Sequence, residues 1–468
     1  MVMSVSITPQ WLRNANYTLV ATTTITLVGF TLEAFAFWPG LMSVDSIVQY
    51  TQAVLRHYSD QHPPVMAWLW SWTDRVVTGP GGMLIVHLGL LWIGLWAIAE
   101  GARQRGLRHA WLVPLVGFMP TIANIAGVIW KDVGMAYALL CAGGLLYASH
   151  RVKRATRVVA IAAALILMAY ATMARANAAA ATLAVACYWV AVAFPRARLP
   201  RAIVGGVTVI ALLLVVQQIV ERKALNASHQ YLSQLILLFD LTGIACGGAD
   251  VQIPDAFRVP TKDASMLCKA YDPDQVDKLF FFTDSPLRVS YDEAAYKQLR
   301  TVWLATILAH PRLYINHHAR SFSGLLGIRR ASANDRALRQ PFMQANPWGF
   351  TFAPNLLSRG VDATTDALAD SGIFSGLLWL SLAVILLVII VRRRMSLPFE
   401  SALLASALMY FLPYFFLSLT PNYRFIYWSV VATSVAGILV TLRLIEHCDT
   451  ARRGGHRNRP ATRGRLAI

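Results

Sequence analysis

The polar residues best suited to chemistry lie beside apolar segments of the chain. The stretch from Trp38 to Pro64, WPGLMSVDSIVQYTQAVLRHYSDQHPP, follows the first long apolar run and concentrates acids, imidazoles, amides and aromatics. Its candidates for catalysis or substrate contact are Asp45, Gln49, Tyr50, Asp60 and His62. Polar side chains next to a hydrocarbon-spanning segment are costly unless they meet a partner or a substrate. We therefore expect this stretch to form one half of a site.

Three later pairs of polar residues supply candidates for the other half. Each pair stands at the end of an apolar run: Lys131 with Asp132, Arg175 with Asn177, and Tyr423 with Arg424. Basic side chains that converge from three segments make an anion site, and a lipid phosphate is the anion available at a membrane surface. An aspartate among them would act as general base toward a hydroxyl acceptor while the cations stabilise a leaving phosphate.

Each of these residues also has a purely structural interpretation. Asp45 is placed to cap the helix that follows it. In the structural interpretation, Lys131 and Asp132 form an ion pair with each other at the membrane interface. Arg175 and Arg424 would equally anchor lipid headgroups, and His62 precedes a proline and suits a turn.

Composition assigns the chain to the membrane proteins. Of its 468 residues 56% are hydrophobic and only 14% are charged, and the mean hydropathy is +0.49. The net charge of +18 does not indicate nucleic-acid binding, because the basic residues cluster in short loops between apolar runs. That distribution is the positive-inside pattern of a polytopic membrane protein. The five cysteines have no metal-binding spacing.

About ten apolar runs are candidates for membrane spans, since about twenty residues of helix cross the hydrocarbon. They are residues 18–37, 83–100, 111–130, 136–147, 158–172, 178–194, 203–220, 373–391, 402–419 and 429–444. Arginine- and lysine-rich loops alternate with loops that carry few charges. The pattern predicts cytoplasmic N- and C-termini and places the candidate site residues on the outer face. Residues 44–55 and 65–78 are predicted to form interfacial helices.

The fold predicted from these runs is an all-α polytopic membrane protein with four parts. The first part is an N-terminal transmembrane module, residues 1–220, which includes the outer loop 38–64. It is followed by an α-rich extracytoplasmic domain, residues 221–371, and by a C-terminal transmembrane module, residues 372–446. The last part is a basic cytoplasmic tail, residues 447–468, expected to be disordered from Arg452. Proline is expected to divide or kink the helices at Pro311 and Pro413. Cys246 and Cys268 fall in the extracytoplasmic part, which predicts a disulfide; two free thiols are the alternative.

The order of these parts resembles the GT-C superfamily of integral membrane glycosyltransferases. It is most similar to the bacterial relatives of the protein O-mannosyltransferases and of the lipid A aminoarabinose transferase. The residues that carry the resemblance are Asp45 with His62-Pro63, Lys131-Asp132, Arg175 with Asn177, His310-Pro311 with Tyr314, and Tyr423-Arg424. One departure is that Ser46 follows Asp45, where many members carry an Asp-Glu pair.

The resemblance implies transfer of a hexose or pentose from a polyprenyl-phosphate donor to a lipid, glycan or protein of the cell envelope, usually with inversion. It assigns catalysis to Asp45 and Asp132, with Asp45 as base, and donor-phosphate binding to Lys131, Arg175 and Arg424. It implies a bacterial inner membrane with a periplasmic active site. No cofactor or metal ligand is assigned, and dependence on a divalent metal stays open, with Asp60 or Glu33 able to share the role of base.

A different class of function also fits the composition. A polysaccharide ligase, or a lipid or solute transporter with an outer-face anion site, would have many spans and outer basic residues too. A transporter would place charges along a path through the middle of the membrane. Here the charges gather at the ends of spans, which favours an interfacial enzyme.

Overall fold

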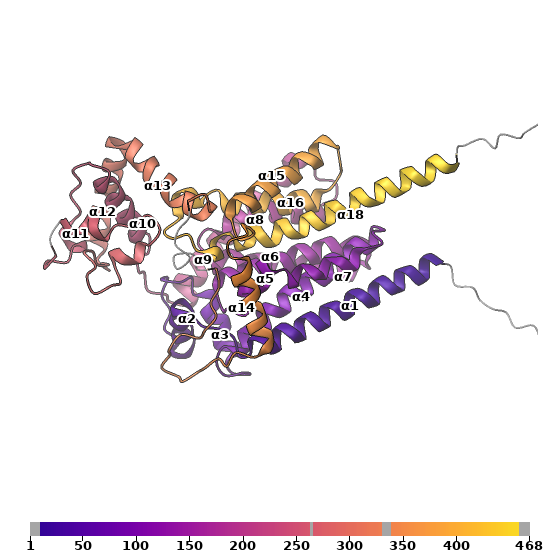
Figure 1. The fold of residues 1–468 in the computed structure, drawn as a ribbon, viewed down its shortest axis with the longest axis horizontal. Helices are drawn as coiled ribbons and strands as arrows, with labels where there is room; N and C mark the ends of the chain where they lie inside the picture. The colour runs from indigo at the N-terminus through magenta and orange to yellow at the C-terminus, as the bar shows by residue number, and fades with distance from the viewer. Residues whose placement is uncertain (1–9, 263–264, 330–337, 458–468) are drawn as a thin grey trace, which may run out of the picture.

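The computed structural model describes residues 10–262, 265–329 and 338–457, and these form a helical bundle with a smaller lobe at one end (Figure 1). The extended segments among them make only isolated bridges. The bundle helices are α1 (Gln10–Phe37), α4 (Gly81–Gln104), α6 (Lys131–Ala148), α7 (Arg154–Ala174), α8 (Ala178–Ala193), α9 (Leu199–Ile219), α15 (Gly376–Arg392), α16 (Pro398–Phe411) and α18 (Tyr427–Arg457).

The remaining α-helices lie in the lobe or flank the bundle. They are α2 (Val44–Leu55), α3 (Val65–Thr73), α5 (Pro120–Ala126), α10 (Gln234–Cys246), α11 (Ser265–Ala270), α12 (Glu293–Ala309), α13 (Pro311–Leu326), α14 (Leu356–Leu368) and α17 (Tyr414–Leu417). Single turns of 3-10 or π helix cover Ser149–Arg151, Val220–Ala224, Asp255–Phe257, Val276–Leu279 and Tyr423–Ile426, and a longer 3-10 helix covers Ala110–Phe118.

Seven helices in the described part of the chain are long and apolar enough to cross a membrane. They are Tyr17–Phe37, Gly81–Gln104, Lys131–Arg151, Arg154–Ala174, Leu199–Ala224, Pro398–Leu417 and Tyr423–His447. Helices α8 and α15 coincide with two further predicted spans and are shorter. Nine of the ten spans predicted from the sequence are therefore apolar helices that are continuous or nearly continuous.

The predicted span at residues 111–130 is wrong as a continuous helix. The chain there forms the 3-10 helix Ala110–Phe118, then α5, then an extended segment. Pro114 and Pro120 lack the N–H that an α-helix interior needs, and Met119 before Pro120 is extended at ψ 134°. Two prolines therefore break the helix that the apolar run alone suggested.

This broken segment still carries the chain along the full length of the bundle. The contacts between α4 and α6 show that these helices run parallel. Gly134 faces His87 near the start of both helices, and Gly101 faces Tyr147 near the end of both. A Cβ on Gly101 would lie 2.5 Å from the Tyr147 ring, so these helices touch through small residues. The residues between α4 and α6 must therefore return from one end of the bundle to the other.

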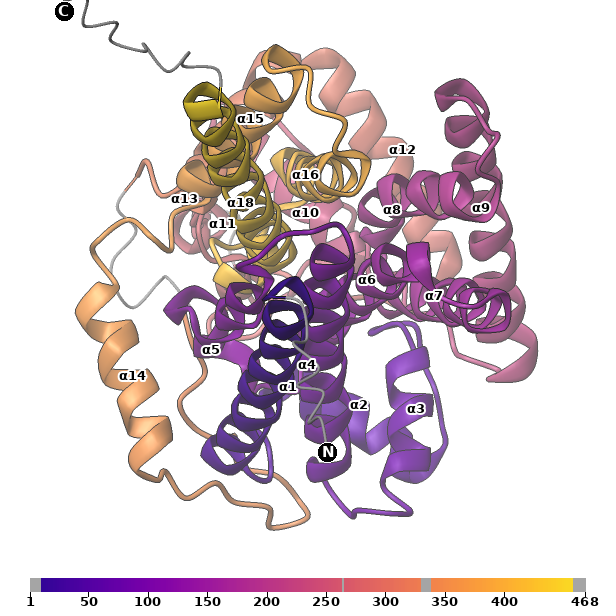
Figure 2. The same ribbon diagram turned by 90° about the vertical axis from the view of Figure 1, so that its right-hand side faces the viewer.

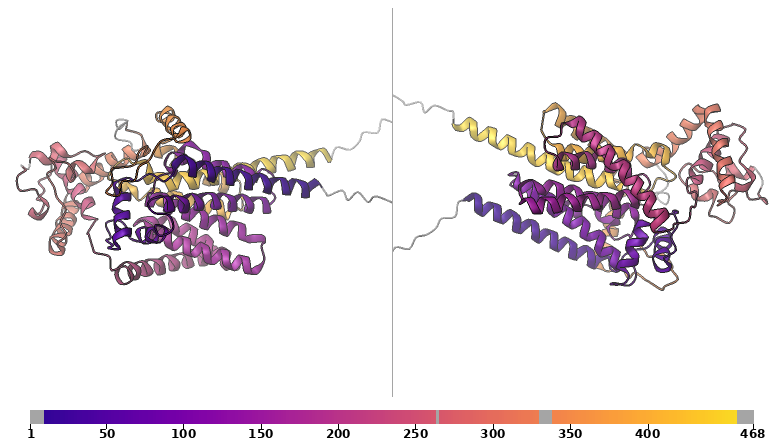
Figure 3. Two further views of the ribbon diagram at one scale, coloured as in Figure 1. Left: turned by 90° about the horizontal axis from the view of Figure 1, so that it is seen from below. Right: turned by 180° about the vertical axis from the view of Figure 1, so that it is seen from behind.

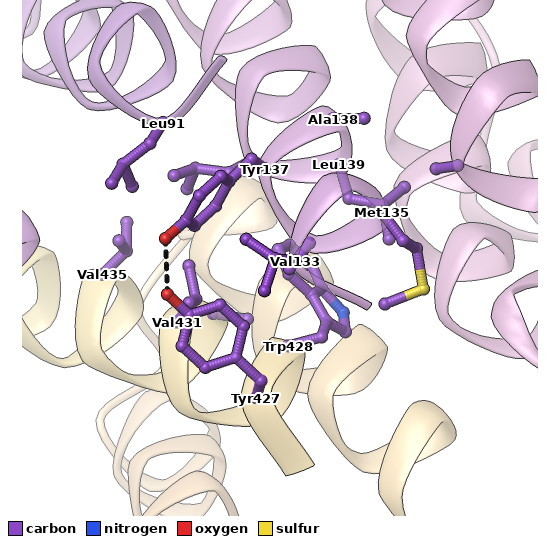
Figure 4. Close-up of a cluster of buried hydrophobic side chains, with 14 of the residues drawn as sticks. Leu91, Val133, Met135, Tyr137, Ala138, Leu139, Tyr427, Trp428, Val431 and Val435 are labelled. Atoms are coloured by element: carbon purple, nitrogen blue, oxygen red, sulfur yellow. Dashed lines mark hydrogen bonds between the residues drawn. The ribbon is translucent and has the colours of Figure 1, made fainter. Parts of the chain in front are cut away.

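Helices α6 and α18 pack in the centre of the bundle. Figure 4 shows Tyr137 and Tyr427 meeting through their hydroxyl groups, 2.6 Å apart, among Leu91, Val431 and Val435. All of these side chains are almost completely buried. This contact fixes the start of α18, and with it the turn that holds Arg424, beside α6.

The lobe, which we define as residues 237–299, has its own hydrophobic cluster that includes Leu238, Phe257 and Leu299. Figure 1 shows its helices α10, α11 and α12 at the end of the bundle opposite the first turn of α1 and the last turn of α18, and both views of Figure 3 agree. Helix α14 lies beside α1 and α5 at the edge of the bundle (Figure 2). We call the end of the bundle nearest the lobe the lobe end.

Both proline predictions are confirmed. Helix α12 ends at Ala309 and α13 begins at Pro311, while α16 ends at Phe411 and α17 follows Pro413. Cys246 and Cys268 form a disulfide between α10 and α11, as predicted. The disorder expected from Arg452 is wrong for its first residues, because α18 continues to Arg457; residues 458–468 of the predicted tail lie outside the described part.

Candidate active site

The site begins with a backbone contact that joins two distant segments. Leu41 forms a parallel bridge with Val128: its N–H donates to the Gly127 carbonyl and its carbonyl accepts from Ile129, each at 2.9 Å. The segments that follow these residues lead directly into α2 and α6. As a result, the first turns of α2 and α6 lie side by side at the lobe end.

Side chains strengthen this junction. The Ser46 hydroxyl donates to the Ile129 carbonyl at 2.9 Å, and Trp130 Nε1 donates to the Ser43 hydroxyl at 2.7 Å. Ser43 is the N-cap of α2, and its N–H donates to the Ser46 hydroxyl. Since Ser43 and Ser46 make the capping contacts, the carboxylate of Asp45 is left for another partner.

That partner is Arg424 in the turn before α18. Its Nη1 donates to Asp45 Oδ2 at 2.6 Å, and the side chain of Asp45 keeps 28% of its exposure. The guanidinium also lies 5.0 Å from the centre of the Trp130 ring. Burial raises the pKa of the Asp45 carboxyl, but the positive charges of Arg424 and Lys131 outweigh it and hold that pKa well below its usual range.

His62 connects Asp45 to Lys131. Lys131 Nζ lies 2.6 Å from His62 Nδ1, and His62 Nε2 lies 3.9 Å from Asp45 Oδ1. Burial, reinforced by the charge of Lys131, lowers the pKa of His62 to about 3. His62 is therefore a neutral acceptor for the lysine at neutral pH, with its other nitrogen turned toward Asp45.

Asp132, the neighbour of Lys131, belongs to a second buried cluster. It forms an ion pair with Arg175 and is fully buried. Arg175 also donates from Nε to Asn177 at 2.8 Å and from Nη2 to the Tyr414 hydroxyl at 2.5 Å. Lys131 and Asp132 are thus not paired with each other; they point into two neighbouring groups.

Phe425 joins the two groups. Its ring centre lies 5.2 Å from the guanidinium carbon of Arg175 and 5.4 Å from that of Arg424. Lys131, Arg175 and Arg424 bring three positive charges against the negative charges of Asp45 and Asp132. With three basic side chains and a neutral His62 around two carboxylates, the combined site suits an anion.

Several polar atoms at this site have no hydrogen-bond partner among the described residues. They are Asp132 Oδ2, Arg424 Nε, Gln49 Oε1 and Asn177 Nδ2. Buried polar atoms are normally paired, so these are the atoms that a ligand or water would satisfy.

Three of the predicted substrate contacts lie elsewhere. The Tyr50 hydroxyl donates to Asp74 at 2.8 Å and its ring packs on Trp348. Asp60 accepts from the backbone N–H of Gln230 at 2.6 Å and pairs with His229. The Tyr423 hydroxyl donates to the Thr121 carbonyl at 2.6 Å inside the core. These side chains position the site's segments instead of lining it.

The surroundings of Asp45 do not fit a divalent cation. Its carboxylate faces the Arg424 guanidinium, and Lys131 lies on the far side of the His62 ring. Two cations at this position would repel a metal ion. Glu33, which with Asp60 was also considered for the role of base, accepts from Trp92 Nε1 at 2.8 Å inside the bundle.

Sequence reasoning missed Trp130, Tyr414 and Phe425. All three line the cationic groups, and two of them directly adjoin a candidate residue in the sequence, Trp130 before Lys131 and Phe425 after Arg424. An aromatic residue beside a basic one at the end of an apolar run was the available signal. Tyr414 had no such signal, since it reaches Arg175 only because Pro413 redirects the chain.

Comparison with known proteins gives one similar solved structure. No family model matches the chain, and no curated protein sequence matches it. The oligosaccharyltransferase of Archaeoglobus fulgidus, solved with a tethered acceptor peptide that contains an NVT sequon, is similar with a TM-score of 0.38 and 14% identity. The match covers 96% of this chain and 52% of that one, so this chain spans about half the length of that enzyme.

Proposed function

We propose that the protein is a membrane glycosyltransferase that moves a sugar from a polyprenyl-phosphate donor to a hydroxyl group of a cell-envelope acceptor. The observation that supports this most is the contact of the Asp45 carboxylate with a cluster of cations at one end of the bundle. A carboxylate beside a phosphate-binding group is what displacement of a sugar phosphate requires. We place this site on the periplasmic face of a bacterial inner membrane.

In the proposed reaction the acceptor oxygen attacks the anomeric carbon from the face opposite the phosphate. Its proton passes to the Asp45 carboxylate as the new carbon–oxygen bond forms. The bond from the anomeric carbon to the phosphate oxygen breaks, and that oxygen keeps the bonding electrons. Lys131, Arg175 and Arg424 stabilise the charge that grows on the phosphate. The product has the inverted anomeric configuration.

The ion pair between Asp45 and Arg424 has a consequence for this reaction. A carboxylate whose pKa is held low by a neighbouring arginine is a weak base. A donor phosphate that binds Arg424 competes with Asp45 for the guanidinium and adds negative charge nearby. Both effects raise the pKa of Asp45, so donor binding would itself activate the base.

Asp132 has a supporting role in this proposal. It is fully buried and holds Arg175, which Asn177 and Tyr414 also contact. We therefore assign Asp132 to positioning Arg175 toward the phosphate. Gln49 and Asn177 would contact substrate through their unpaired amide atoms.

The test uses purified protein in nanodiscs and a panel of radiolabelled polyprenyl-phosphate hexoses and pentoses. Wild-type protein is expected to transfer the sugar or release it slowly to water. Asp45→Asn should lower turnover by at least about 100-fold, the contribution of a general base. Asp284→Asn, the same change at an exposed acid, is the control and should keep full activity.

Two results would overturn the proposal. A folded Asp45→Asn protein with full activity would remove Asp45 from the mechanism. Absence of both turnover and binding for every polyprenyl phosphate would leave the cationic cluster as an anion site of a ligase or transporter.

A further inference from the structure

A second group of polar residues lies between the lobe and the bundle, apart from the site described above. Asp240 comes from α10, and His317 and His318 come from α13. Asp240 Oδ1 lies 3.5 Å from His317 Nε2 and 3.3 Å from His318 Nε2. One ligand atom from each residue lies within 4.8 Å of the other two. All three side chains are almost completely buried, at 1% or 2% exposure.

The facing atoms of this group lie at ion-pair distance from one another but make no hydrogen bond in the described part of the chain. Asp240 Oδ1, His317 Nε2 and His318 Nε2 have no hydrogen-bond partner within the described residues. A buried carboxylate oxygen without a hydrogen bond is unfavourable, and buried polar atoms in folded proteins are nearly always satisfied. One bound ion would satisfy all three of these atoms together.

The remaining atoms of two of these residues are well held. Trp303 Nε1 donates to Asp240 Oδ2 at 2.8 Å, and the Tyr271 hydroxyl lies 2.7 Å from His317 Nδ1. With the proton on Nδ1, His317 donates to the Tyr271 oxygen and presents the lone pair of Nε2. Such outer contacts are typical of metal ligands, since they fix the tautomer and the ring orientation.

The backbone around the group leaves room for these rings. Gly243 lies almost one turn after Asp240, and a Cβ there would lie 2.2 Å from His317 Nδ1. The disulfide from Cys246 to Cys268 holds α11, which Tyr271 follows, against the end of α10. The ring of Phe239 packs edge-on against His317 at 4.6 Å. The group is thus a built, buried site and not a chance meeting of surface side chains.

We propose that Asp240, His317 and His318 bind a divalent transition-metal ion of the zinc type. Imidazole and carboxylate are ligands of Zn²⁺, at about 2.0–2.2 Å each. In a tetrahedral site with bonds of that length, neighbouring ligand atoms are about 3.3–3.6 Å apart. The distances from Asp240 Oδ1 to His317 Nε2 and to His318 Nε2 fall in this range. Three protein ligands leave the fourth position to water.

The metal would join the lobe to the bundle. Asp240 belongs to the hydrophobic cluster of the lobe through its neighbours Phe239 and Leu241, whereas His318 packs on Phe416 of α17 at 5.4 Å. Tyr414, at the start of the same short helix, contacts Arg175. The ion would therefore stabilise the position of α17 without entering the proposed transfer reaction.

The test measures metal directly and needs no activity. Full-length protein is purified with a tag that contains no histidine, treated with EDTA and exchanged into zinc-free buffer. Addition of ZnCl₂ is expected to restore one zinc per chain by elemental analysis and to raise the melting temperature as the zinc concentration rises. With CoCl₂ the protein should show the visible absorption of a tetrahedral cobalt site.

Variants identify the ligands. Asp240→Asn and His318→Gln should each reduce bound zinc at least tenfold and abolish the rise in melting temperature. His57→Gln, which changes an exposed histidine of the α2–α3 loop, is the matched control and should bind zinc like the wild type. If a variant fails to fold, the wild-type titration and the cobalt spectrum still decide the matter.

Two outcomes would overturn the proposal. One is wild-type protein that binds less than about a tenth of an equivalent of zinc and shows no change in melting temperature; the three residues would then form only a polar contact. The other is zinc that binds equally well to the wild type and to both ligand variants, which would locate it elsewhere. Neither outcome bears on the glycosyl-transfer proposal.

Discussion

Asp45 and Arg424 form an ion pair of 2.6 Å across 379 positions of the chain. Asp45 lies in the first turn of α2, and Arg424 lies in the turn before α18. The bridge between Leu41 and Val128 and the contact between Tyr137 and Tyr427 bring both turns beside α6. The candidate base and a candidate phosphate ligand are therefore held together by the packing of the bundle.

Arg424→Ala should affect both substrate binding and the base. Loss of the guanidinium removes a phosphate contact, so we expect the KM for the donor to rise at least about tenfold, equivalent to 1.4 kcal/mol. It also removes the charge that lowers the pKa of Asp45. The acid limb of the kcat/KM profile against pH should therefore move to higher pH.

Arg424→Lys is the control, because it keeps the charge and loses the planar guanidinium. It should restore the acid limb toward the wild-type position while KM stays raised. A pH profile that is identical in the wild type and Arg424→Ala would contradict the assignment of Asp45 as base.

His62 should make the folded protein sensitive to mild acid. Its pKa is about 3 in the folded state and about 6.5 in an unfolded chain. Between these values the unfolded chain binds a proton that the native site does not, so stability falls as pH decreases from about 6.5 toward 3. Asp45, whose pKa is also lowered on folding, adds to this only below the usual pKa of a carboxyl, about 4.

The measurement is the melting temperature in detergent from pH 7.5 to pH 5. His62→Gln should flatten the decrease, while His57→Gln at an exposed position should leave it unchanged. An equal slope in the wild type and His62→Gln would show that His62 is not the group that responds.

Asp132→Ala should destabilise the protein by about 3–5 kcal/mol, because it leaves the charge of Arg175 buried without its partner. Arg175→Met in the same chain should recover much of this loss, since neither charge then remains. A double-mutant cycle on thermal unfolding measures the coupling between the two residues. Effects that simply add would mean that the pair does not contribute as a unit.

Removal of the disulfide should weaken the lobe. Cys246 and Cys268 are separated by 22 positions, and a loop of that size is worth about 3 kcal/mol. The double variant Cys246→Ala/Cys268→Ala should therefore melt at lower temperature and be cut faster by protease within residues 237–299. Cys187→Ala, at a free cysteine, should show neither change.

The sequence by itself determined the membrane class, most of the spans and the polar residues at their ends. These follow from local properties: the length of apolar runs, the distribution of arginine and lysine, and the loss of a backbone donor at Pro311 and Pro413. The length of the apolar run failed to predict the structure of residues 111–130. A broken segment that is buried in the bundle is as apolar as a continuous spanning helix, so hydropathy alone does not distinguish the two. Prolines in that run carried the information that the apolar count ignored.

Only the tertiary structure decided which polar residues meet. Adjacent Lys131 and Asp132 look like one pair in the sequence, yet a helix turns by about 100° per residue, and they enter separate groups. Tyr423 stands next to Arg424 in a turn of 3-10 helix, where successive side chains also point in different directions, and it faces the core. Asp240 and His317 meet because α13 folds back onto α10. Such contacts depend on the packing of helices from distant parts of the chain, which local sequence patterns do not encode.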